Sequence, residues 1–587
     1  MNLKLEIDTF FAFIRTFVYP HWKIGTAIFF TTLLSSGLRI VRPLLILFLI
    51  DNILPNKDFP MLKGVFFLYF LNVILGYVIL LIQDFLIEST RQKIKFFIQL
   101  KLFKHIQLLP LSFFIDKESG YLSTRILSDT ETLDYMFVDT FANLITNIIT
   151  VAGILITTFA INGTIASIMI LLIPPHILLS VMFIGKLKQV TNETQEMRAT
   201  LGQEYQETFG AIYFIKSFSL EKIFDLKLVR KLKFLVRRSV LREYLRSLSS
   251  NTTSLFTAIS TWVIIYILGI DILQGRSSIG VIYVIIVYLN MFFSSVQSLI
   301  YTNTRFQQSV AIIRRIYQIL EEPISNEYRK GVTINNINKG IVYRNVTFSY
   351  NSDKKALNKI NLFFKKDKIT AVVGKTGSGK TTLINLLLGL FESYEGNIFF
   401  DNLELRQIDK KTLRSIMALV PQAPFLFSAS VRDNISLGNP RASYEMIIQA
   451  AKLSNAHDFI IKLPNQYDTF IGEKGIRLSG GEKQRLALAR AIIRNPAVLI
   501  IDEGTSQIDS NSEDLILESL RYLKKGRIII LIAHRLSTIL VADRIIVLDA
   551  GKIVGAGTHD YLLVKCPHYR SLFESQISQG ILAVDTR

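Results

Sequence analysis

The chain has 587 residues, 50% of them hydrophobic, and its mean hydropathy of +0.35 excludes an ordinary soluble multidomain protein. Its formal net charge is +20, and such a basic excess is found both in nucleic-acid-binding proteins and in the cytoplasmic flanks of membrane proteins. The single cysteine, Cys566, excludes an intramolecular disulfide and a cysteine pair that holds a metal.

Six hydrophobic stretches in the first half of the chain predict six membrane-spanning helices. They lie at residues 24–50, 61–86, 138–161, 164–184, 253–273 and 279–300. The first stretch is too long for the apolar segment of a signal peptide, so we expect it to be a span of the folded protein. The first half is therefore predicted to be an integral membrane domain in contact with the lipid bilayer.

Two long polar segments, one after the second stretch and one after the fourth, hold many of the basic residues of the first half. These are Arg91, Lys93, Lys95, Lys101 and Lys104 in one segment, and Lys227, Arg230, Lys231, Lys233, Arg237, Arg238, Arg242 and Arg246 in the other. The positive-inside rule places these segments, both termini and the second half of the chain in the cytoplasm. A nucleic-acid groove at 227–246 is the alternative. We expect no nucleic-acid partner, because this stretch flanks membrane spans.

The chain changes character near residue 320. The polar segment "EEPISNEYRKG" reads as a linker, and beyond it β-rich runs such as "ITAVVG" and "AVLIID" alternate with helical patterns. This alternation predicts an α/β domain with a largely parallel sheet. We therefore expect a transmembrane domain at 1–320, a linker at 321–339 and a nucleotide-binding domain at 340–587.

A glycine-rich loop between a predicted strand and a predicted helix is the most specific motif. It comprises Gly374, Lys375, Thr376, Gly377, Ser378, Gly379, Lys380, Thr381 and Thr382. The glycines allow consecutive backbone N–H groups to point at phosphate oxygens. Lys380 then reaches the β- and γ-phosphates of ATP, and the Thr381 hydroxyl is suited to Mg²⁺.

An apolar strand, "AVLII", ends in two carboxylates, Asp502 and Glu503. Carboxylates at the end of a buried strand cost desolvation energy unless a cation or another partner lies nearby. Asp502 is predicted to serve the metal, and Glu503 to polarise the attacking water. A second anion-binding helix N-terminus is predicted at "LSGGEKQR", where Ser479, Gly480 and Gly481 precede a helical run.

Together, the phosphate loop, "LSGGEKQR" and "LIIDE" resemble an ATP-binding cassette (ABC) ATPase. With six spans ahead of them, the chain resembles an ABC exporter half-transporter of the bacterial multidrug, lipid or peptide type over nearly its whole length. The resemblance implies four further roles: Tyr350 stacks on adenine, Gln422 binds Mg²⁺ and takes part in catalysis, His534 lies near the γ-phosphate, and Asp509 contacts the nucleotide. Gly504 and Gln507 depart from the usual pattern of the family.

The resemblance also implies a dimer, made with a second copy or with a homologous half-transporter. In that arrangement Ser479, Gly480 and Gly481 contact the ATP held by the other chain. Segments 109–129 and 207–221 resemble the coupling helices of exporters; their alternative reading is as plain polar connections between helices. The expected function is ATP-driven export of an amphipathic lipid, drug or peptide out of the cytoplasm or the inner leaflet, across the bacterial cytoplasmic membrane.

Two groups of polar residues within the spans are candidates for substrate contact. Asn290, Ser294 and Gln297 recur at helical spacing on the sixth span, where they either line a cavity or make interhelical hydrogen bonds. Arg39 and Arg42 lie one turn apart in the first span, where a charge is costly without a partner. Either the carboxylates of Asp51 or Asp84 compensate them, or they face a wet cavity that accepts an anionic substrate.

Two further function classes use the same ATPase. An ATP-gated channel or regulatory membrane protein is the alternative to an exporter, and vectorial transport distinguishes the two. A soluble ABC protein of DNA repair or translation is excluded by the six predicted spans.

Overall fold

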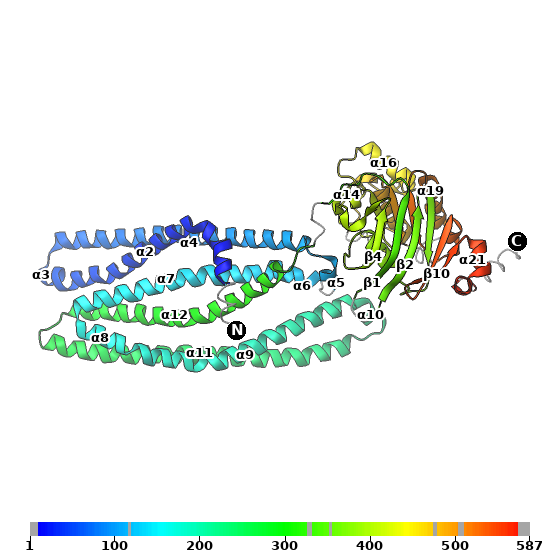
Figure 1. Ribbon diagram of the computed structural model, residues 1–587. Helices are drawn as coiled ribbons and strands as arrows, with labels where there is room; N and C mark the ends of the chain where they lie inside the picture. The colour runs from blue at the N-terminus through cyan, green and yellow to red at the C-terminus, as the bar shows by residue number, and fades with distance from the viewer. Residues whose placement is uncertain are drawn as a thin grey trace. The chain divides into compact units, whose positions relative to one another are not determined.

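The computed structural model describes residues 10–115, 119–325, 331–350, 355–472, 478–502, 510–533, 535–572 and 574. The chain divides into two compact units (Figure 1). The helical unit comprises Met1–Gln107 and Glu118–Glu322, and the sheet unit comprises Leu108–Lys117 and Pro323–Arg587.

The helical unit is built from long helices, as the hydropathy predicts. Its main helices are α2 (Trp22–Phe48), α4 (Phe59–Gln107), α7 (Thr130–Ile161), α8 (Gly163–Leu171), α9 (Ile173–Gly210), α11 (Glu221–Leu273) and α12 (Ile279–Leu320). Shorter helical segments connect or extend them: η1 (Ile14–Val18), η2 (Tyr19–His21), η3 (Leu49–Ile53), α3 (Leu54–Asn56), α6 (Ser119–Thr124), η4 (Arg125–Asp129) and α10 (Ile212–Ser217).

The six predicted spans are confirmed. In the described part of the chain, 6 helical stretches are long and apolar enough to cross a membrane. The 27 residues of α2 alone extend about 40 Å at 1.5 Å per residue, which exceeds the hydrocarbon thickness of about 30 Å. The helical unit is therefore an integral membrane domain.

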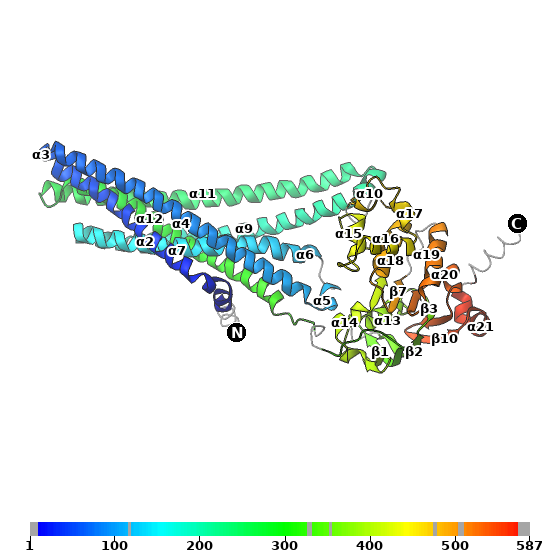
Figure 2. The same ribbon diagram turned by 90° about the horizontal axis from the view of Figure 1, so that it is seen from above.

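Helix α12 packs against α2, α4, α7, α9 and α11 and supplies most of the buried residues of one core cluster of the helical unit. Its buried side chains recur every three or four residues, at Val281, Val284, Ile285, Tyr288, Leu289, Phe292 and Phe293. The Tyr288 hydroxyl donates to the Ile40 carbonyl of α2 over 2.7 Å, which fixes the first span against the last. Helices α9 and α11 run side by side as a pair (Figure 2).

Two buried carboxylates join helices of this unit outside the predicted spans, and each has two cationic partners. Asp129 at the end of η4 accepts from Arg125 at 2.6 Å, and from Arg315 of α12 at 3.2 Å on both oxygens. Glu204 of α9 pairs with Lys227 and Lys231 of α11 at 3.2 and 2.7 Å. In both places the fold compensates its cations internally.

The sheet unit holds two sheets. The larger has the order β10-β9-β3-β8-β7-β6 and is parallel except for β10, which confirms the predicted α/β class. Its strands are β3 (Lys368–Val373), β6 (Met417–Val420), β7 (Val498–Asp502), β8 (Ile528–Ile532), β9 (Arg544–Asp549) and β10 (Lys552–Gly557). The smaller, antiparallel sheet contains β1 (Gly340–Ser349), β2 (Lys355–Lys365), β4 (Glu395–Phe400) and β5 (Leu403–Glu404).

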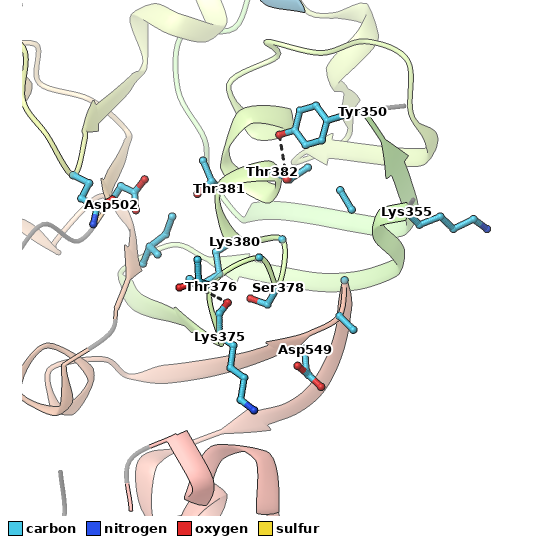
Figure 3. A pocket seen from close by; sticks show the side chains of 17 residues that line it. Tyr350, Lys355, Lys375, Thr376, Ser378, Lys380, Thr381, Thr382, Asp502 and Asp549 are labelled. Atoms are coloured by element: carbon cyan, nitrogen blue, oxygen red, sulfur yellow. Dashed lines mark hydrogen bonds between the residues drawn. The ribbon is translucent and has the colours of Figure 1, made fainter. Parts of the chain in front are cut away.

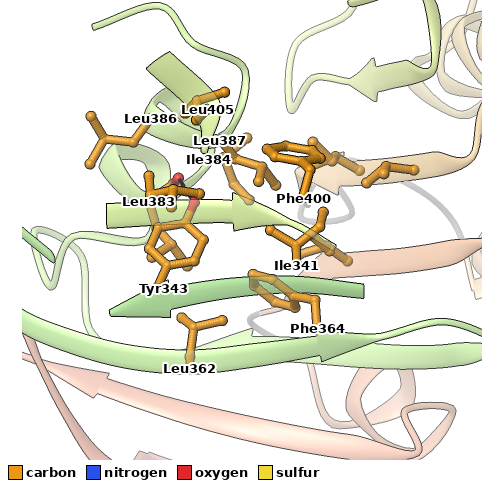
Figure 4. Packing of buried hydrophobic residues seen from close by; sticks show 14 of the residues in the cluster. Ile341, Tyr343, Leu362, Phe364, Leu383, Ile384, Leu386, Leu387, Phe400 and Leu405 are labelled. Atoms are coloured by element: carbon orange, nitrogen blue, oxygen red, sulfur yellow. Dashed lines mark hydrogen bonds between the residues drawn. The ribbon is translucent and has the colours of Figure 1, made fainter. Parts of the chain in front are cut away.

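Helices pack around these sheets. They are α5 (Leu111–Ile115), α13 (Lys380–Leu387), α14 (Lys410–Ser415), α15 (Val431–Ser436), α16 (Tyr444–Leu453), α17 (His457–Ile460), α18 (Gly480–Ile492), α19 (Ser510–Leu523), α20 (Leu536–Leu540) and α21 (His559–Lys565), with 3₁₀ turns η6 (Leu405–Gln407) and η7 (Gln466–Asp468). Buried residues of α13 pack on Ile341, Phe364 and Phe400 of the smaller sheet (Figure 4). The Tyr343 hydroxyl donates to the Leu383 carbonyl over 3.0 Å. This packing fixes the helix that follows the phosphate loop.

Candidate nucleotide site

The phosphate loop connects the carboxyl end of β3 to the start of α13. Gly377 and Gly379 have φ values of 81° and 105°, a region that side-chain-bearing residues rarely adopt. A Cβ atom at Gly379 would lie 2.6 Å from the Ala356 carbonyl oxygen, so the loop is also tightly backed. No side chain caps the N-terminus of α13, which leaves that end of the helix for a ligand.

Lys380 is buried at 6% exposure beneath this loop. Its Nζ donates to the carbonyl oxygens of Gly374 at 2.7 Å and Lys375 at 3.0 Å. Ser378 is also buried, and its hydroxyl has no hydrogen-bond partner among the described residues. A buried cation and an unpartnered buried hydroxyl in a glycine-rich curl fit a phosphate chain.

Eleven of the predicted nucleotide residues line one cavity of about 880 Å³, whereas Gly374 at the start of the loop is not among its lining residues (Figure 3). From the sequence prediction these are Tyr350, Lys375, Thr376, Gly377, Ser378, Gly379, Lys380, Thr381, Thr382, Gln422 and Asp502. Three of them carry oxygen donors suited to Mg²⁺: the Thr381 hydroxyl, the Gln422 amide and the Asp502 carboxylate. The cavity therefore combines a phosphate cradle with a donor set for a hard cation.

Tyr350 follows β1 at the rim of this cavity. Its hydroxyl lies 3.2 Å from the Thr382 hydroxyl, and its ring meets Phe348 and Phe391 edge-on at centroid distances of 4.9 and 5.4 Å. These contacts orient a ring that is still 48% exposed. An oriented, half-exposed aromatic ring offers a stacking face for an adenine base.

Asp502 is the last residue of β7 and is partly buried in the cavity wall. Burial raises the pKa of its carboxyl group above the ordinary value, and the nearby Lys380 ammonium opposes this shift. The carboxylate is therefore under-compensated in the nucleotide-free protein. A divalent cation at this position would relieve that cost.

Six further lining residues were missed by the sequence reasoning: Lys355, Ala356, Ile532, Asp549, Ala550 and Gly551. The last three form the turn between β9 and β10, next to β3 in the sheet. Gly551 N–H donates to the Ser378 carbonyl over 3.1 Å, so this turn supports the phosphate loop from behind. The sequence signal was present as "DAG" after an apolar strand, a pattern typical of a hairpin turn.

Ser479, Gly480 and Gly481 lie apart from this cavity, since none of them is among the described residues that line it. They begin α18, and the helix end is closed by its own side chains in a capping box. The Ser479 hydroxyl accepts from Glu482 N–H at 3.3 Å, and the Glu482 carboxylate accepts from Ser479 N–H at 2.8 Å. This second helix end, which the sequence predicts to bind an anion, is therefore preformed and self-capped.

Glu503, Asp509 and His534 lie outside the described residues, as do the departures Gly504 and Gln507. Their assigned roles rest on the sequence and remain predictions.

Comparison with known proteins covers both units. A model of the ABC transporter transmembrane region matches residues 26–296, and an ABC transporter model matches residues 357–506. The chain is 33% identical over 552 residues to the ATP-dependent lipid A-core flippase of Syntrophus aciditrophicus (strain SB), covering 93% of this chain and 90% of that protein. The chain belongs to the ABC transporter family.

Two further comparisons span the whole transporter. It is 29% identical over 571 residues to YgaD of Bacillus subtilis (strain 168), provisionally named a multidrug export ATP-binding/permease protein, covering 95% of this chain and 98% of that one. The solved structure of a bacterial Atm1-family ABC exporter with ATP bound has the same fold, with a TM-score of 0.81 at 23% identity, covering 94% and 98% of the two chains. This ABC transporter is a transport ATPase.

The polar face of the sixth span has a mixed role in the transporter. Gln297 donates to the Thr253 hydroxyl of α11 over 3.2 Å, which is an interhelical hydrogen bond. Asn290 and Ser294 are exposed, and among the described residues they hydrogen-bond only to backbone carbonyls of their own helix. All three line a cavity of about 390 Å³ between α11 and α12, together with Ser254, Thr257, Ala258, Thr261, Trp262 and Phe293.

The two arginines of the first span are not paired with the expected carboxylates. Asp51 accepts from the Ser278 hydroxyl at 2.5 Å and from Gly280 N–H at 2.9 Å, and among the described residues it makes no ion pair with Arg39 or Arg42. Asp84 is exposed and makes no ion pair with either arginine. The hypothesis of internal carboxylate partners is therefore wrong for these two candidates, because helix packing directs Asp51 to α12 instead.

Proposed function

We propose that this transporter is a half-transporter that works as a dimer and exports an amphipathic substrate at the expense of ATP. One observation carries the proposal. The cavity of the sheet unit contains the phosphate loop, the adenine-stacking ring and the metal donors, whereas Ser479, Gly480 and Gly481 begin a different helix. A site completed by the α18 end of a second chain accounts for both halves.

Different residues of the nucleotide site bind the adenine, the phosphates, Mg²⁺ and the attacking water. Tyr350 stacks on the adenine, loop N–H groups bind the phosphates, and Lys380 exchanges its carbonyl partners for phosphate oxygens. Thr381, Gln422 and Asp502 would hold Mg²⁺, which neutralises charge on the transferring phosphoryl group. Glu503 orients and deprotonates the attacking water, and His534 contacts the γ-phosphate.

Substrate contact is assigned to the polar cavity between α11 and α12. Hydroxyl and amide groups at Asn290, Ser294 and Gln297 face the rings of Trp262 and Phe293 in one cavity, so it offers both hydrogen bonds and apolar surface. Such a lining suits an amphipathic molecule. The relatives are named for multidrug and lipid A-core substrates, and both classes are amphipathic.

The orientation follows from charge. The basic segments of α4 and α11 and the sheet unit lie on the cytoplasmic side of the bacterial inner membrane. Helix α10 and the residue that follows it expose three aromatic rings. Tyr213, Phe214 and Phe218 are 86%, 52% and 64% exposed. These exposed rings fit the resemblance of segment 207–221 to a coupling helix.

The experiment is transport by the purified full chain in proteoliposomes, with a fluorescent phospholipid and an amphipathic dye as substrates. We expect ATP-dependent movement against a gradient, in proportion to ATP hydrolysed. Lys380→Ala is the control; it should lose ATP affinity by roughly 10- to 100-fold, because charge-assisted hydrogen bonds to the phosphates are lost. Passive flux that follows ATP binding without a fixed ratio to hydrolysis would instead support a gated channel.

A further inference from the structure

A polar seam runs between the first two spans. On α2 it contains Thr32, Ser35, Arg39 and Arg42, and on α4 it contains Asn72, Gly76 and Gln83. The residues of each helix are spaced by three, four or seven positions, which places them on one face. The two helices lie side by side in the structure (Figure 1).

At one end of the seam the polar groups satisfy one another. The Ser35 hydroxyl donates to Gln83 Oε1 at 3.2 Å, and Gln83 Nε2 donates to the Thr32 hydroxyl at 3.1 Å. All three side chains are buried. This part of the seam is a closed neutral network that fixes the register of α2 on α4.

At the other end the seam carries two positive charges with neutral partners only. Arg42 Nε donates to Asn72 Oδ1 at 2.9 Å, and Arg39 Nε donates to its own helix at the Ser35 carbonyl, 3.5 Å away. In the described part of the chain these are the only hydrogen bonds of the two guanidinium groups, and neither has an ion pair. Their Nη donors are therefore unused there.

The guanidinium group of Arg42 packs against α4 at Gly76. Its Nη2 atom lies so close to α4 that a Cβ at Gly76 would come within 2.2 Å of it. Glycine at this position admits the planar group against the helix backbone. The contact fixes the orientation of Arg42, and a preorganised guanidinium loses little freedom when it binds an anion.

Among the described residues no carboxylate pairs with these arginines, in contrast to two other cation clusters of the helical unit. Arg125 and Arg315 share Asp129, and Lys227 and Lys231 share Glu204. Arg39 and Arg42 lie within an apolar span, where an uncompensated charge is more costly than it is at those positions. Because the described residues supply no carboxylate here, water or a negative group from elsewhere must compensate the two charges.

We infer that Arg39 and Arg42 form a binding site for the phosphate or carboxylate group of an anionic amphiphile. The inference rests on the proposed export function and specifies its substrate class. The fork of Nη donors matches the oxygens of either anion. Leu33, Leu34 and Val41 on α2 and Leu81 on α4 are exposed and lie within two residues of seam residues in the sequence, so the same two helices offer surface for an apolar chain.

Binding to the full chain in detergent tests this without ATP turnover. The probe is a fluorescent phosphatidylglycerol, displaced by phosphatidylcholine, dodecanoate or inorganic phosphate. We expect displacement by dodecanoate and not by phosphatidylcholine; displacement by inorganic phosphate as well would assign the site to the anion alone rather than to a lipid. If phosphatidylcholine competes as well as dodecanoate, the inference is overturned.

Two variants remove the site in different ways. Arg39→Gln with Arg42→Gln deletes the charges, and Asn72→Asp supplies the missing carboxylate 2.9 Å from Arg42 while preserving shape. Both should weaken probe binding by roughly tenfold or more, the worth of one charge-assisted hydrogen bond. Lys63→Gln with Arg276→Gln is the charge-matched control and should bind normally.

The variants also separate the site from a structural role. If the double glutamine variant fails to fold, Asn72→Asp decides alone, because an internal ion pair should stabilise the fold while it blocks the probe. A stabilised Asn72→Asp protein that binds the probe with wild-type affinity overturns the inference. Loss of ATP-driven transport with normal probe binding would count against the proposed function only.

Discussion

The two glycine-led helix ends of the sheet unit differ in how their N-termini are satisfied. The end of α13 has glycine at the N-cap and no side-chain cap, while Lys380 turns back onto its own loop. The end of α18 is closed by Ser479 and Glu482. The first depends on a ligand to complete it, and the second is stable without one. This difference fits the proposed roles, in which the α13 end binds the reacting phosphates and the α18 end only recognises a phosphate.

The largest expected effect is the loss of ATP hydrolysis at the nucleotide site that contains the α13 end. Glu503→Gln should lower ATP turnover by roughly 10²–10⁴, the usual contribution of a positioned general base, and should leave ATP binding intact. Steady-state hydrolysis and nucleotide affinity of the purified protein measure the two effects. Near-normal hydrolysis would remove Glu503 from the mechanism.

Mixing two defective chains tests whether the two ends act across a dimer. Lys380→Ala damages the α13 end and Ser479→Arg the α18 end, so each homodimer should be inactive. In a mixed dimer one composite site pairs both lesions and the other is intact, so ATPase activity should return if one intact site turns over alone.

Co-expression with two affinity tags isolates the mixed dimer for this assay. If both ends belonged to one site within each chain, every site would carry a lesion, and no mixture would recover activity.

A smaller effect is expected at the self-capped end. The Glu482 carboxylate occupies the N-terminus of α18 that an incoming phosphate needs. Glu482→Gln retains a capping side chain but removes its charge. In a Glu503→Gln background, ATP-driven closure of the dimer should then need roughly two- to fivefold less ATP. This factor corresponds to the about 0.3–1 kcal/mol contributed by a charge at a helix end.

Dimer formation against ATP concentration measures this shift. Glu445→Gln, which removes the same charge from the first turn of α16, is the matched control. An unchanged or higher ATP requirement in Glu482→Gln would show that the carboxylate does not compete with phosphate.

The smallest expected effect is on the thermal stability of the nucleotide-free protein, through the Asp502 carboxyl group. Because burial raises the Asp502 pKa, the folded protein holds this proton more tightly than the unfolded chain, so stability falls as pH rises through the folded pKa. Asp502→Asn should therefore raise the Tm of the nucleotide-free protein at neutral pH, and the difference should shrink on acidification towards the ordinary pKa of aspartate. An equal Tm at neutral pH would contradict the shift.

The sequence predicted the features that depend only on residues close together in the chain. Span positions follow from hydropathy, and the phosphate loop and the strand ending at Asp502 follow from glycine spacing and a β-rich run. The capping box of α18 was also readable as Ser479 followed three residues later by Glu482, and it was overlooked.

Features that depend on which helices become neighbours could not be read in the same way. Asp51 was a reasonable partner for Arg42 by sequence distance, but packing against α12 gives it the Ser278 hydroxyl and Gly280 N–H instead. The contact between Arg42 and Gly76 joins residues of two spans, and no local pattern marks it. The support of the phosphate loop by Gly551 likewise requires the strand order of the sheet.

The burial of Asp129 determines how the helical unit responds to ionic strength. Its carboxylate is 10% exposed, so mobile ions screen its bonds to Arg125 and Arg315 only weakly. The Lys216–Glu221 pair beside α10 is 68% and 45% exposed and is screened readily. We therefore expect rising salt to weaken the Lys216–Glu221 pair more than the bonds of Asp129.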